Sequence, residues 1–253
     1  MSSFRVVIPA RMGSTRLPGK VLREIAGRPM LAHVYERARE SGAEEIVIAV
    51  DDQAIADVAT ALGAGVCLTD PGHASGTDRI NEVAGRMGWQ DEDIVVNLQG
   101  DEPCMPPQVI QQVADMFNEH PEADISTLCH RISSYEDWQN PNLVKVVFDN
   151  EGKALYFSRS AIPYNRDASG TLPSAGAFGH LGIYGYRVGA LRRFSSLPAG
   201  LLENSEALEQ LRALENGMCI FVHEATAEPG PGVDTEADLL RAAQCLEQRF
   251  RHN

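Results

Sequence analysis

One stretch decides the fold expected of this 253-residue chain: Val6-Val7-Ile8-Pro9-Ala10-Arg11-Met12-Gly13-Ser14-Thr15-Arg16-Leu17-Pro18-Gly19-Lys20. It begins with consecutive apolar residues, a pattern typical of a strand buried on both faces of a parallel sheet. The loop that follows contains two prolines, two glycines and three cations. Open α/β sheets bind ligands beyond the carboxyl ends of their strands. Because free backbone N–H groups and convergent cations suit a polyphosphate, the stretch predicts a phosphate site.

Two familiar phosphate-binding motifs do not fit this loop. A Walker A loop requires G-x-x-x-x-G-K-[ST], but five residues separate Gly13 from Gly19, and Val21 occupies the place of the magnesium-binding hydroxyl. The G-x-G-x-x-G dinucleotide fingerprint is also absent. The loop therefore binds phosphate in another way, or it is a solvated surface loop. Composition alone leaves both interpretations open.

The first half of the chain repeats a strand-helix pattern four times. The expected strands are 6–8, 46–50, 66–68 and 94–98, and the expected helices are 29–39, 52–62, 75–87 and 107–118, with Thr77 as an N-cap. Such a repeat predicts a parallel sheet wound with right-handed crossovers.

After residue 120 the pattern changes. The expected strands are 124–130, 144–148, 154–158, 180–186 and 218–225, and the expected helices are 133–138, 190–195, 204–216 and 236–249, with a Gly/Ser-rich loop over 167–179. The sequence contains no internal repeat and no convincing linker. We therefore expect one α/β domain, residues 1–253, with an elaborated second half.

Composition limits the classes of function. The formal net charge of −13 argues against a general nucleic-acid surface and against an anionic membrane face. An anionic ligand at the cationic loop therefore needs local positive charge, to which we expect a metal ion to contribute. The five cysteines form no C-x-x-C pair, and no apolar run approaches 18 residues. These features favour a reducing compartment and indicate neither export nor a membrane span.

Two acidic segments are candidates for holding that metal. Asp101 and Glu102 follow the expected strand 94–98, at the same sheet edge as the cationic loop. Gly-Asp-Glu-Pro is also a sequence typical of a turn, so the residues favour neither a metal site nor a plain turn at this position. Asp234 precedes the last helix, where it could be a cap. However, Thr235 and Asp238 can form a capping pair without it, which leaves Asp234 available for Mg²⁺.

The segment 179–187, Gly-His-Leu-Gly-Ile-Tyr-Gly-Tyr-Arg, predicts a two-faced strand. With a period of two, His180, Tyr184 and Tyr186 share one face around Gly182, and the intervening residues form an apolar face. Glycine within a strand often marks the close approach of a ligand, so we favour a polar pocket here. On the expected helix 204–216, Glu209 and Gln210 fall away from a leucine stripe, where a solvated face is the default.

Taken together, these segments resemble the CMP-KDO synthetases (3-deoxy-manno-octulosonate cytidylyltransferases). The resemblance covers essentially the whole chain in order. The matching segments are Pro9-Ala-Arg with Ser14-Thr-Arg-Leu-Pro-Gly-Lys20, Ser75-Gly-Thr-Asp-Arg79, Asn97 with Gln99-Gly-Asp-Glu-Pro103, Ala154-Leu-Tyr-Phe-Ser-Arg159, His180–Arg187, Leu208-Glu-Gln-Leu-Arg212 and Gly232-Val-Asp-Thr235. The strand at His180 and the segment Leu208–Arg212 separate this family from other nucleotidyltransferases.

The resemblance implies a three-layer, nucleotide-diphospho-sugar-transferase-like α/β fold with a mixed, mostly parallel sheet. It implies a nucleotide-binding half over about 1–120 and a sugar-binding and dimerisation half over about 121–253. The implied reaction is CTP + KDO → CMP-KDO + diphosphate for lipopolysaccharide synthesis, with Mg²⁺, in a cytoplasmic homodimer that binds no nucleic acid and inserts into no membrane.

The resemblance also assigns roles by position. It implies that Lys20, Arg11, Asp101 and Asp234 are catalytic, with Asp101 and Asp234 binding Mg²⁺. The implied nucleotide site consists of Pro9, Ala10, Arg11, Ser14, Lys20, Gly76, Arg79 and Asp101. The implied sugar site consists of Arg16, Gln99, Arg166, His180, Tyr184, Glu209 and Gln210. Two rival hypotheses remain: activation of another sugar acid or of a sugar phosphate, and a non-catalytic nucleotide-binding regulator.

Overall fold

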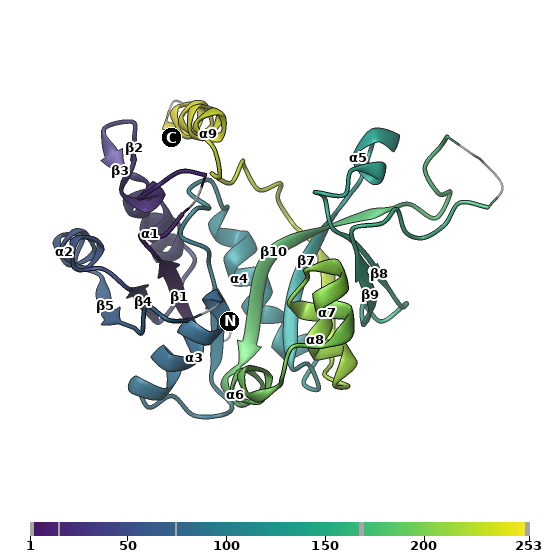
Figure 1. The fold of residues 1–253 in the computed structure, drawn as a ribbon, viewed down its shortest axis with the longest axis horizontal. Helices are drawn as coiled ribbons and strands as arrows, with labels where there is room; N and C mark the ends of the chain where they lie inside the picture. The colour runs from purple at the N-terminus through teal and green to yellow at the C-terminus, as the bar shows by residue number, and fades with distance from the viewer. Residues whose placement is uncertain (1–2, 15, 74, 167–169, 251–253) are drawn as a thin grey trace.

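A computed structural model describes residues 3–14, 16–73, 75–166 and 170–250. Within these residues a nine-stranded sheet runs through the molecule in the order β11-β7-β10-β6-β1-β4-β5, and β8 and β9 continue from β10 (Figure 1). The strands are β1 (Arg5–Ala10), β4 (Glu45–Val50), β5 (Gly65–Leu68), β6 (Ile94–Asn97), β7 (Ile125–Arg131), β8 (Lys145–Phe148), β9 (Ala154–Ser158), β10 (Phe178–Arg187) and β11 (Ile220–Glu224).

The first half of the chain forms a parallel sheet. Strand β1 pairs in parallel with β4 and β6, and β4 pairs in parallel with β5. The connecting helices are α1 (Met30–Glu40), α2 (Gln53–Ala61), α3 (Gly76–Arg86) and α4 (Pro107–Glu119). The four predicted strand-helix units are thus confirmed. Strand β10 then pairs antiparallel with β6 and β7, so the predicted mixed, mostly parallel sheet is also confirmed.

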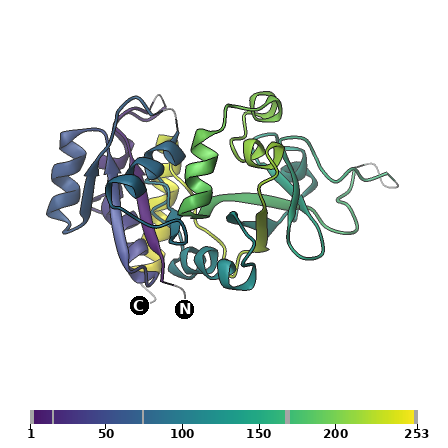
Figure 2. The ribbon, with the colours of Figure 1, turned by 90° about the horizontal axis from the view of Figure 1, so that it is seen from below.

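Two apolar cores lie on opposite faces of this sheet. The face of β1 that carries Val6 and Ile8 packs with α1, α4 and α9 (Glu236–Phe250), and the face that carries Val7 packs with α3, α6 (Val188–Ser196) and α8 (Gln210–Glu215). Figure 2 shows the sheet between these helices. Burial of each helix's apolar stripe against the sheet is the main source of its stability.

Two details of the sequence-based assignment are wrong. The expected helix 204–216 is two helices, α7 (Leu201–Glu206) and α8, because Ala207 adopts a left-handed φ of 50° and ends α7. The N-cap of α3 is Ser75, whose hydroxyl accepts the N–H of Asp78 at 3.1 Å. Thr77 lies inside the helix instead. A short 3₁₀ turn η1 (Lys20–Leu22) and a hairpin of β2 (Glu24–Ile25) and β3 (Arg28–Pro29) were not predicted.

The second half extends beyond the sheet. Helix α5 (Tyr135–Gln139) and residues 159–166 and 170–177 project from the end of the molecule that carries β8 and β9 (Figure 1). None of the five cysteines, which all lie within the described residues, forms a disulfide, as the sequence predicts. Among the helices of the described residues, none combines the length and the apolar character needed to cross a bilayer.

Candidate functional site

A cavity of about 240 Å³ opens at the carboxyl ends of β1 and β6. Its lining comes from four separate stretches of sequence, which the parallel sheet brings to one edge. The lining residues are Pro9, Arg11, Ser14, Arg16, Lys20, Val21, His73, Ser75, Gly76, Arg79, Gln99, Gly100, Asp101 and Asp234. The cationic loop of the opening stretch is therefore part of a concave site, and the interpretation of it as a plain solvated loop is wrong.

Lys20 joins the two predicted metal-binding aspartates. Its Nζ lies 2.5 Å from Oδ2 of Asp101 and 3.0 Å from Oδ1 of Asp234, and it also donates to the carbonyl of Val233 at 3.2 Å. Burial works to lower the pKa of Lys20, but the two carboxylates raise it above its usual value. The ammonium therefore stays charged and holds the two acidic loops together.

The loop before α9 reaches the cavity through a backbone contact. The N–H of Val233 donates to the carbonyl of Asp101 at 2.9 Å, which places Asp234 beside Asp101. Thr235 and Asp238 cap α9 reciprocally, with 2.8 Å from Thr235 N to Asp238 Oδ2 and 3.3 Å from Asp238 N to Thr235 Oγ1. This confirms the predicted capping pair. The side chain of Asp234 faces Lys20 and Arg16 instead.

A third carboxyl group, that of Glu102, stands next to Asp101 in the sequence. Its pKa is raised to about 8, mainly by burial and in addition by the negative charges of Asp101 and Asp234, while Lys20 works in the opposite direction. Glu102 is therefore mostly protonated at neutral pH, and its raised pKa reflects the negative potential of the two aspartates. The hard carboxylate oxygens of Asp101 and Asp234 are donors of the kind that Mg²⁺ prefers.

The cationic loop has a defined shape. The N–H of Gly19 donates to the carbonyl of Met12 at 3.3 Å, and Gly19 has a φ of +62°, which favours glycine. Arg16 pairs with Asp234 at 2.9 Å, whereas Arg11 lies exposed at the cavity. Ser14 accepts the N–H of Leu17 at 3.4 Å. The loop thus presents its cations around the space beside Lys20.

On the other side of the cavity lie Arg79, Gln99 and Gly76. Arg79 is buried, and its guanidinium bonds the Thr69 hydroxyl and lies 3.3 Å from Asp51. Gln99 donates to Asn97 at 3.2 Å. These side chains are held before any ligand binds. Ala10 is buried behind the cavity and does not line it.

Gly100 has a steric reason to be glycine. A Cβ built there would lie 2.7 Å from the carbonyl oxygen of Pro9, a contact that real side chains do not tolerate. The absence of a side chain lets the loop after β6 approach the end of β1. This approach sets the spacing between Asp101 and Lys20.

A second polar group lies on the α3–α8 face of the sheet. The ring centroids of His180 and Tyr184 are 5.3 Å apart, and those of Tyr184 and Tyr186 are 6.0 Å apart. The alternation predicted for this strand is confirmed. A bulge in β10 between Leu181 and Tyr184 interrupts the pairing with β7 but does not change this alternation. The bulge inserts two residues into β10, and an even number of extra residues keeps the period of two.

Thr127 on β7 organises the bulge. Its hydroxyl lies 2.7 Å from the carbonyl of Ile183, 3.2 Å from that of Leu181 and 2.9 Å from Nε2 of His180. Burial lowers the pKa of His180 to about 3, with a smaller contribution from His130. The imidazole is therefore neutral at physiological pH.

Glu209 completes this second group from the turn before α8. It accepts the hydroxyl of Thr77 at 2.9 Å, and burial raises its pKa while the bonds to Thr77 and Ser75 lower it. Its Oε1 is buried and has no hydrogen-bond partner within the described part of the chain. Gln210 is buried as well. The default interpretation of a solvated face is therefore wrong for Gln210, whereas the Glu209 side chain is half-buried, with 33% of it exposed.

The predicted sugar residues fall into three places. Arg16 and Gln99 line the cavity, while His180, Tyr184, Glu209 and Gln210 lie off it in the neighbouring group, linked to it through Ser75-Gly76-Thr77. Arg166 lines a different cavity, with Tyr135, Trp138 and Tyr164. The single chain thus does not place Arg166 with the other predicted sugar residues.

Sequence reasoning missed several lining residues. His73 reaches the cavity from a turn and pairs with Glu82 at 2.6 Å. Ser75 stands beside the predicted Gly76, so adjacency in the sequence could have indicated it. Nothing in the sequence singles out Thr127, because its role depends on the bulge in the opposite strand.

Two acidic loops around a lysine, beside a cationic loop at the end of a parallel sheet, define a nucleotidyltransferase-like class of protein. A model of the cytidylyltransferase family matches residues 5–220. The chain belongs to this family. Its relatives include 3-deoxy-manno-octulosonate cytidylyltransferases of Thioalkalivibrio sulfidiphilus, 50% identical over 96% of this chain and 99% of the relative, and of Cellvibrio japonicus, 52% identical over 97% and 98%.

Solved structures agree with this assignment. A structure of CMP:2-keto-3-deoxy-manno-octonic acid synthetase complexed with CTP is 42% identical, with a TM-score of 0.90 over 98% of this chain and 100% of that one. A cytidylyltransferase of Leptospira borgpetersenii, 17% identical with a TM-score of 0.59 over 99% of this chain and 95% of that one, shares the fold.

Proposed function

We propose that this chain transfers the cytidylyl group of CTP to the anomeric hydroxyl of KDO, releasing diphosphate and supplying CMP-KDO for lipopolysaccharide synthesis. One observation carries the proposal: Lys20 joins Asp101 and Asp234 within a cavity lined by further cations. The names of relatives that are about 50% identical over nearly the whole chain support the choice of CTP and KDO.

The nucleotide would occupy the cavity. Lys20, Arg11 and Ser14 surround the space that suits the triphosphate, where ammonium, guanidinium and hydroxyl groups neutralise phosphate oxygens. The base and ribose would lie toward Pro9, Gly76 and the anchored Arg79, with Ala10 shaping the wall from behind. Because Arg79 is held by Thr69 and Asp51, it can recognise the base without prior rearrangement.

Asp101 and Asp234 would hold Mg²⁺. The fit rests on two carboxylates that meet at one ammonium and on their negative charge, which adds to burial in raising the pKa of Glu102. When bound, the ion supplies charge neutralisation at the α-phosphate and lowers the pKa of the attacking hydroxyl. Lys20 would then turn to the outer phosphate oxygens and stabilise the departing diphosphate.

The sugar acid would lie between the cavity and the group at His180. Arg16 is suited to the carboxylate through paired N–H donors, and Gln99 offers amide contacts to hydroxyls. Oε1 of Glu209, which makes no hydrogen bond within the described residues and lies 3.9 Å from Arg212, and the neutral imidazole of His180 are acceptors for sugar hydroxyls, with Tyr184 and Gln210 beside them. In-line attack then mainly requires that these groups position the reactants.

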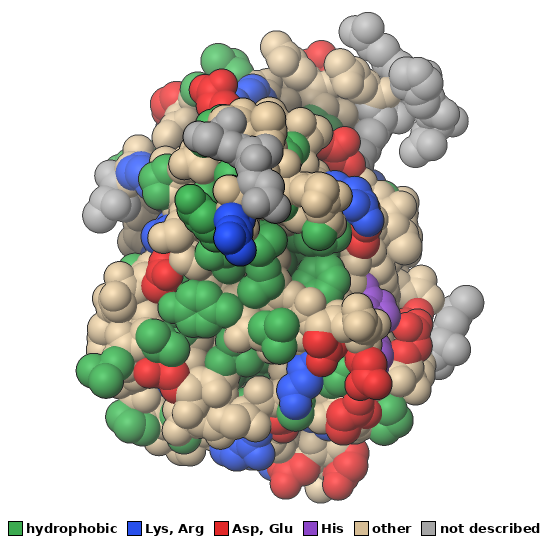
Figure 3. All heavy atoms as spheres, turned by 90° about the vertical axis from the view of Figure 1, so that its right-hand side faces the viewer, with side chains coloured by type: hydrophobic (Ala, Val, Ile, Leu, Met, Phe, Trp, Pro, Cys, Tyr) green, Lys and Arg blue, Asp and Glu red, His purple; other side chains and the backbone are tan. Residues whose placement is uncertain are grey.

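We propose a homodimer that covers the apolar end of the second half. Figure 3 shows hydrophobic side chains gathered on the end of the molecule formed by this half. Strongly exposed apolar residues in this half include Tyr164, Leu201 and Leu155, at 85%, 85% and 61% exposure. Large exposed apolar patches mark interaction sites.

We also propose a division of the chain into two functional halves: residues of about 1–120 bind the nucleotide, and residues of about 121–253 bind the sugar and form the dimer. We place the enzyme in the cytoplasm, where its five cysteines, which form no disulfide, would stay reduced.

The test is diphosphate release by the purified protein with Mg²⁺, in a matrix of nucleotides and acceptors. CTP with KDO is expected to give turnover, whereas ATP, GTP and UTP with KDO, and CTP with a sialic acid, are expected to give little. Turnover with sialic acid instead would move the assignment to another sugar acid. CTP binding without diphosphate release from any acceptor would favour a nucleotide-binding regulator.

A further inference from the structure

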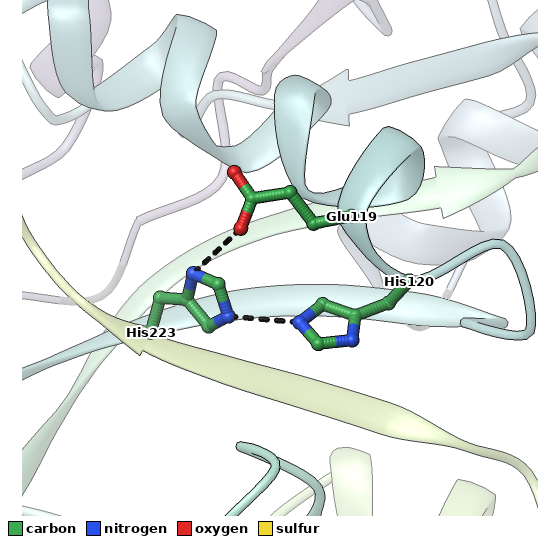
Figure 4. Close-up of side chains that lie close together, drawn as sticks. All are labelled: Glu119, His120 and His223. Carbon is green, nitrogen blue, oxygen red and sulfur yellow. Dashed lines mark hydrogen bonds and ion pairs between the residues drawn. The ribbon is translucent and has the colours of Figure 1, made fainter.

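A cluster of two histidines and a glutamate lies away from the cavity. Glu119 and His120 end helix α4, and His223 lies on strand β11 (Figure 4). One potential ligand atom from each of the three lies within 4.8 Å of the other two. None of these residues lines the catalytic cavity. The cluster lies on the α1–α4–α9 face with Phe221, opposite the face of His180.

We propose that His120 and His223, with Glu119 orienting the ring of His223, form a binding site for a divalent transition-metal ion of the zinc class. Imidazole ligands suit Zn²⁺, Ni²⁺ or Cu²⁺ rather than Mg²⁺, which prefers oxygen ligands alone. The site is independent of the proposed catalytic function, and its ions are chemically distinct from the one proposed at Asp101.

The two imidazoles converge. Nε2 of His120 lies 2.9 Å from Nε2 of His223, and the rings are nearly perpendicular, at 84°. Tetrahedral zinc with Zn–N bonds of about 2.0–2.1 Å separates two ligand nitrogens by roughly 3.3 Å. The nitrogens therefore need to part by only about 0.4 Å to admit an ion between them.

Local packing holds both rings. His120 stacks on Phe221, with centroids 4.0 Å apart and an interplanar angle of 19°. The backbone N–H of His120 caps α4 by donating to the carbonyl of Met116 at 2.9 Å. The carboxyl end of a helix carries partial negative charge, which favours a cation. The backbone of Gly152 lies against the ring of His223 and brings no side chain there.

Glu119 faces the other nitrogen of His223. Its Oε2 lies 3.8 Å from Nδ1, and its side chain is 62% exposed. A carboxylate that accepts Nδ1–H leaves Nε2 as the unprotonated ligand, an arrangement that recurs around metal-binding histidines. An exposed side chain can make the movement of about 0.9 Å that this bond requires.

Such an ion would join helix α4 to strand β11. In the described residues β11 pairs along its length with β7 alone, apart from one bridge between Lys153 and Phe221. A metal bond between His120 and His223 would therefore stabilise the end of the sheet. This gives a readout that does not depend on catalysis.

The experiment titrates ZnCl₂ into chelator-treated full-length protein in the presence of excess Mg²⁺, with a chromophoric chelator as competitor. The informative variants are His120→Phe, which keeps the stack on Phe221, and His223→Gln. Each is expected to bind one zinc ion fewer per chain than the wild type. Glu119→Gln is expected to weaken binding about tenfold. The matched control, His73→Gln, alters the other histidine–glutamate pair (His73 and Glu82) and is expected to retain the site.

Two further measurements on the wild-type protein test for the zinc site even when a variant folds poorly. Zinc is expected to raise the Tm of the wild type by about 5 °C at a hundredfold excess over Kd. The ring NMR signals of His120 and His223 are expected to shift with the same titration. Equal zinc stoichiometry and affinity in the wild type and the two histidine variants would overturn the proposal. So would ring signals of His120 and His223 that stay unchanged in the wild type.

Discussion

The hydroxyl of Thr127 determines which nitrogen of His180 carries the proton. A hydroxyl has a single hydrogen, and the carbonyl of Ile183, at 2.7 Å, takes it. The oxygen can therefore only accept from Nε2 of His180, at 2.9 Å. This leaves Nδ1 as the free acceptor of a neutral ring. The geometry of a bulged strand thereby sets the hydrogen-bonding character of a residue in the proposed sugar pocket.

Replacing Thr127 with Val is expected to raise the KM for KDO about tenfold and to leave the KM for CTP unchanged. The variant removes the acceptor for His180 and the donor to Ile183, and one hydrogen bond is worth about 1 kcal/mol. Thr127→Ser keeps the hydroxyl and is expected to remain within about twofold of the wild type. Steady-state kinetics with each substrate varied in turn provide the measurement. An equal rise in both KM values would show a merely structural role.

The low pKa of His180 predicts a pH dependence of stability. The folded value of about 3 lies below the ordinary 6.5, so the unfolded chain binds the extra proton between these values. Stability is complete above pH 6.5 and is lost as the pH falls toward 3. From this residue we expect a loss of about 2 kcal/mol between pH 6.5 and 4.5. Denaturant unfolding of wild type and His180→Asn at both pH values measures it, and the variant is expected to lose less.

Asp101→Asn is expected to fold normally and to lower kcat by about a hundredfold or more, because the proposed Mg²⁺ site loses a charged ligand. Higher Mg²⁺ concentrations are expected to restore part of the activity. Asp57→Asn, on helix α2 and outside the cavity lining, is the matched control and is expected to retain full activity. A kcat unchanged by Asp101→Asn would remove Asp101 from the metal site.

The proposed dimer predicts the effect of charges placed on its apolar face. Leu201→Asp and Leu155→Asp are expected to weaken self-association at least tenfold, because each would desolvate a carboxylate without a partner (about 1.4 kcal/mol or more). Leu240→Asp is the control, since Leu240 is similarly exposed, at 67%, but lies on α9. Sedimentation velocity measures the change. If Leu201→Asp and Leu155→Asp sediment as the wild type does, the interface lies elsewhere.

Local pattern was enough to predict the parallel half of the fold. Strands such as Ile94–Asn97 are continuous apolar runs that fit only a doubly covered sheet, and their carboxyl ends carry Asp101 and the Lys20 loop to one edge. The meeting of Asp234 with Asp101 could not be derived from pattern. It depends on one backbone contact from Val233 across the fold.

Features that depend on tertiary contacts escaped prediction. Ala207 interrupts a helical pattern by adopting a left-handed conformation, which the sequence does not signal. The partners His120 and His223 are 103 residues apart and show no ligand spacing. Arg166 was assigned by resemblance alone, and the single chain leaves it in a separate cavity. Positions of this kind require the folded arrangement.

The double ion pair of Lys20 has a consequence for the sequence of binding events. In this structure the ammonium of Lys20 lies between the two aspartates, where the proposed Mg²⁺ would bind. A magnesium ion that bound alone would have to displace the Lys20 ammonium and leave it without an anionic partner. A nucleotide that carries the ion also brings phosphates with which the ammonium can pair. The two ligands should thus enter as one unit and reinforce each other's affinity.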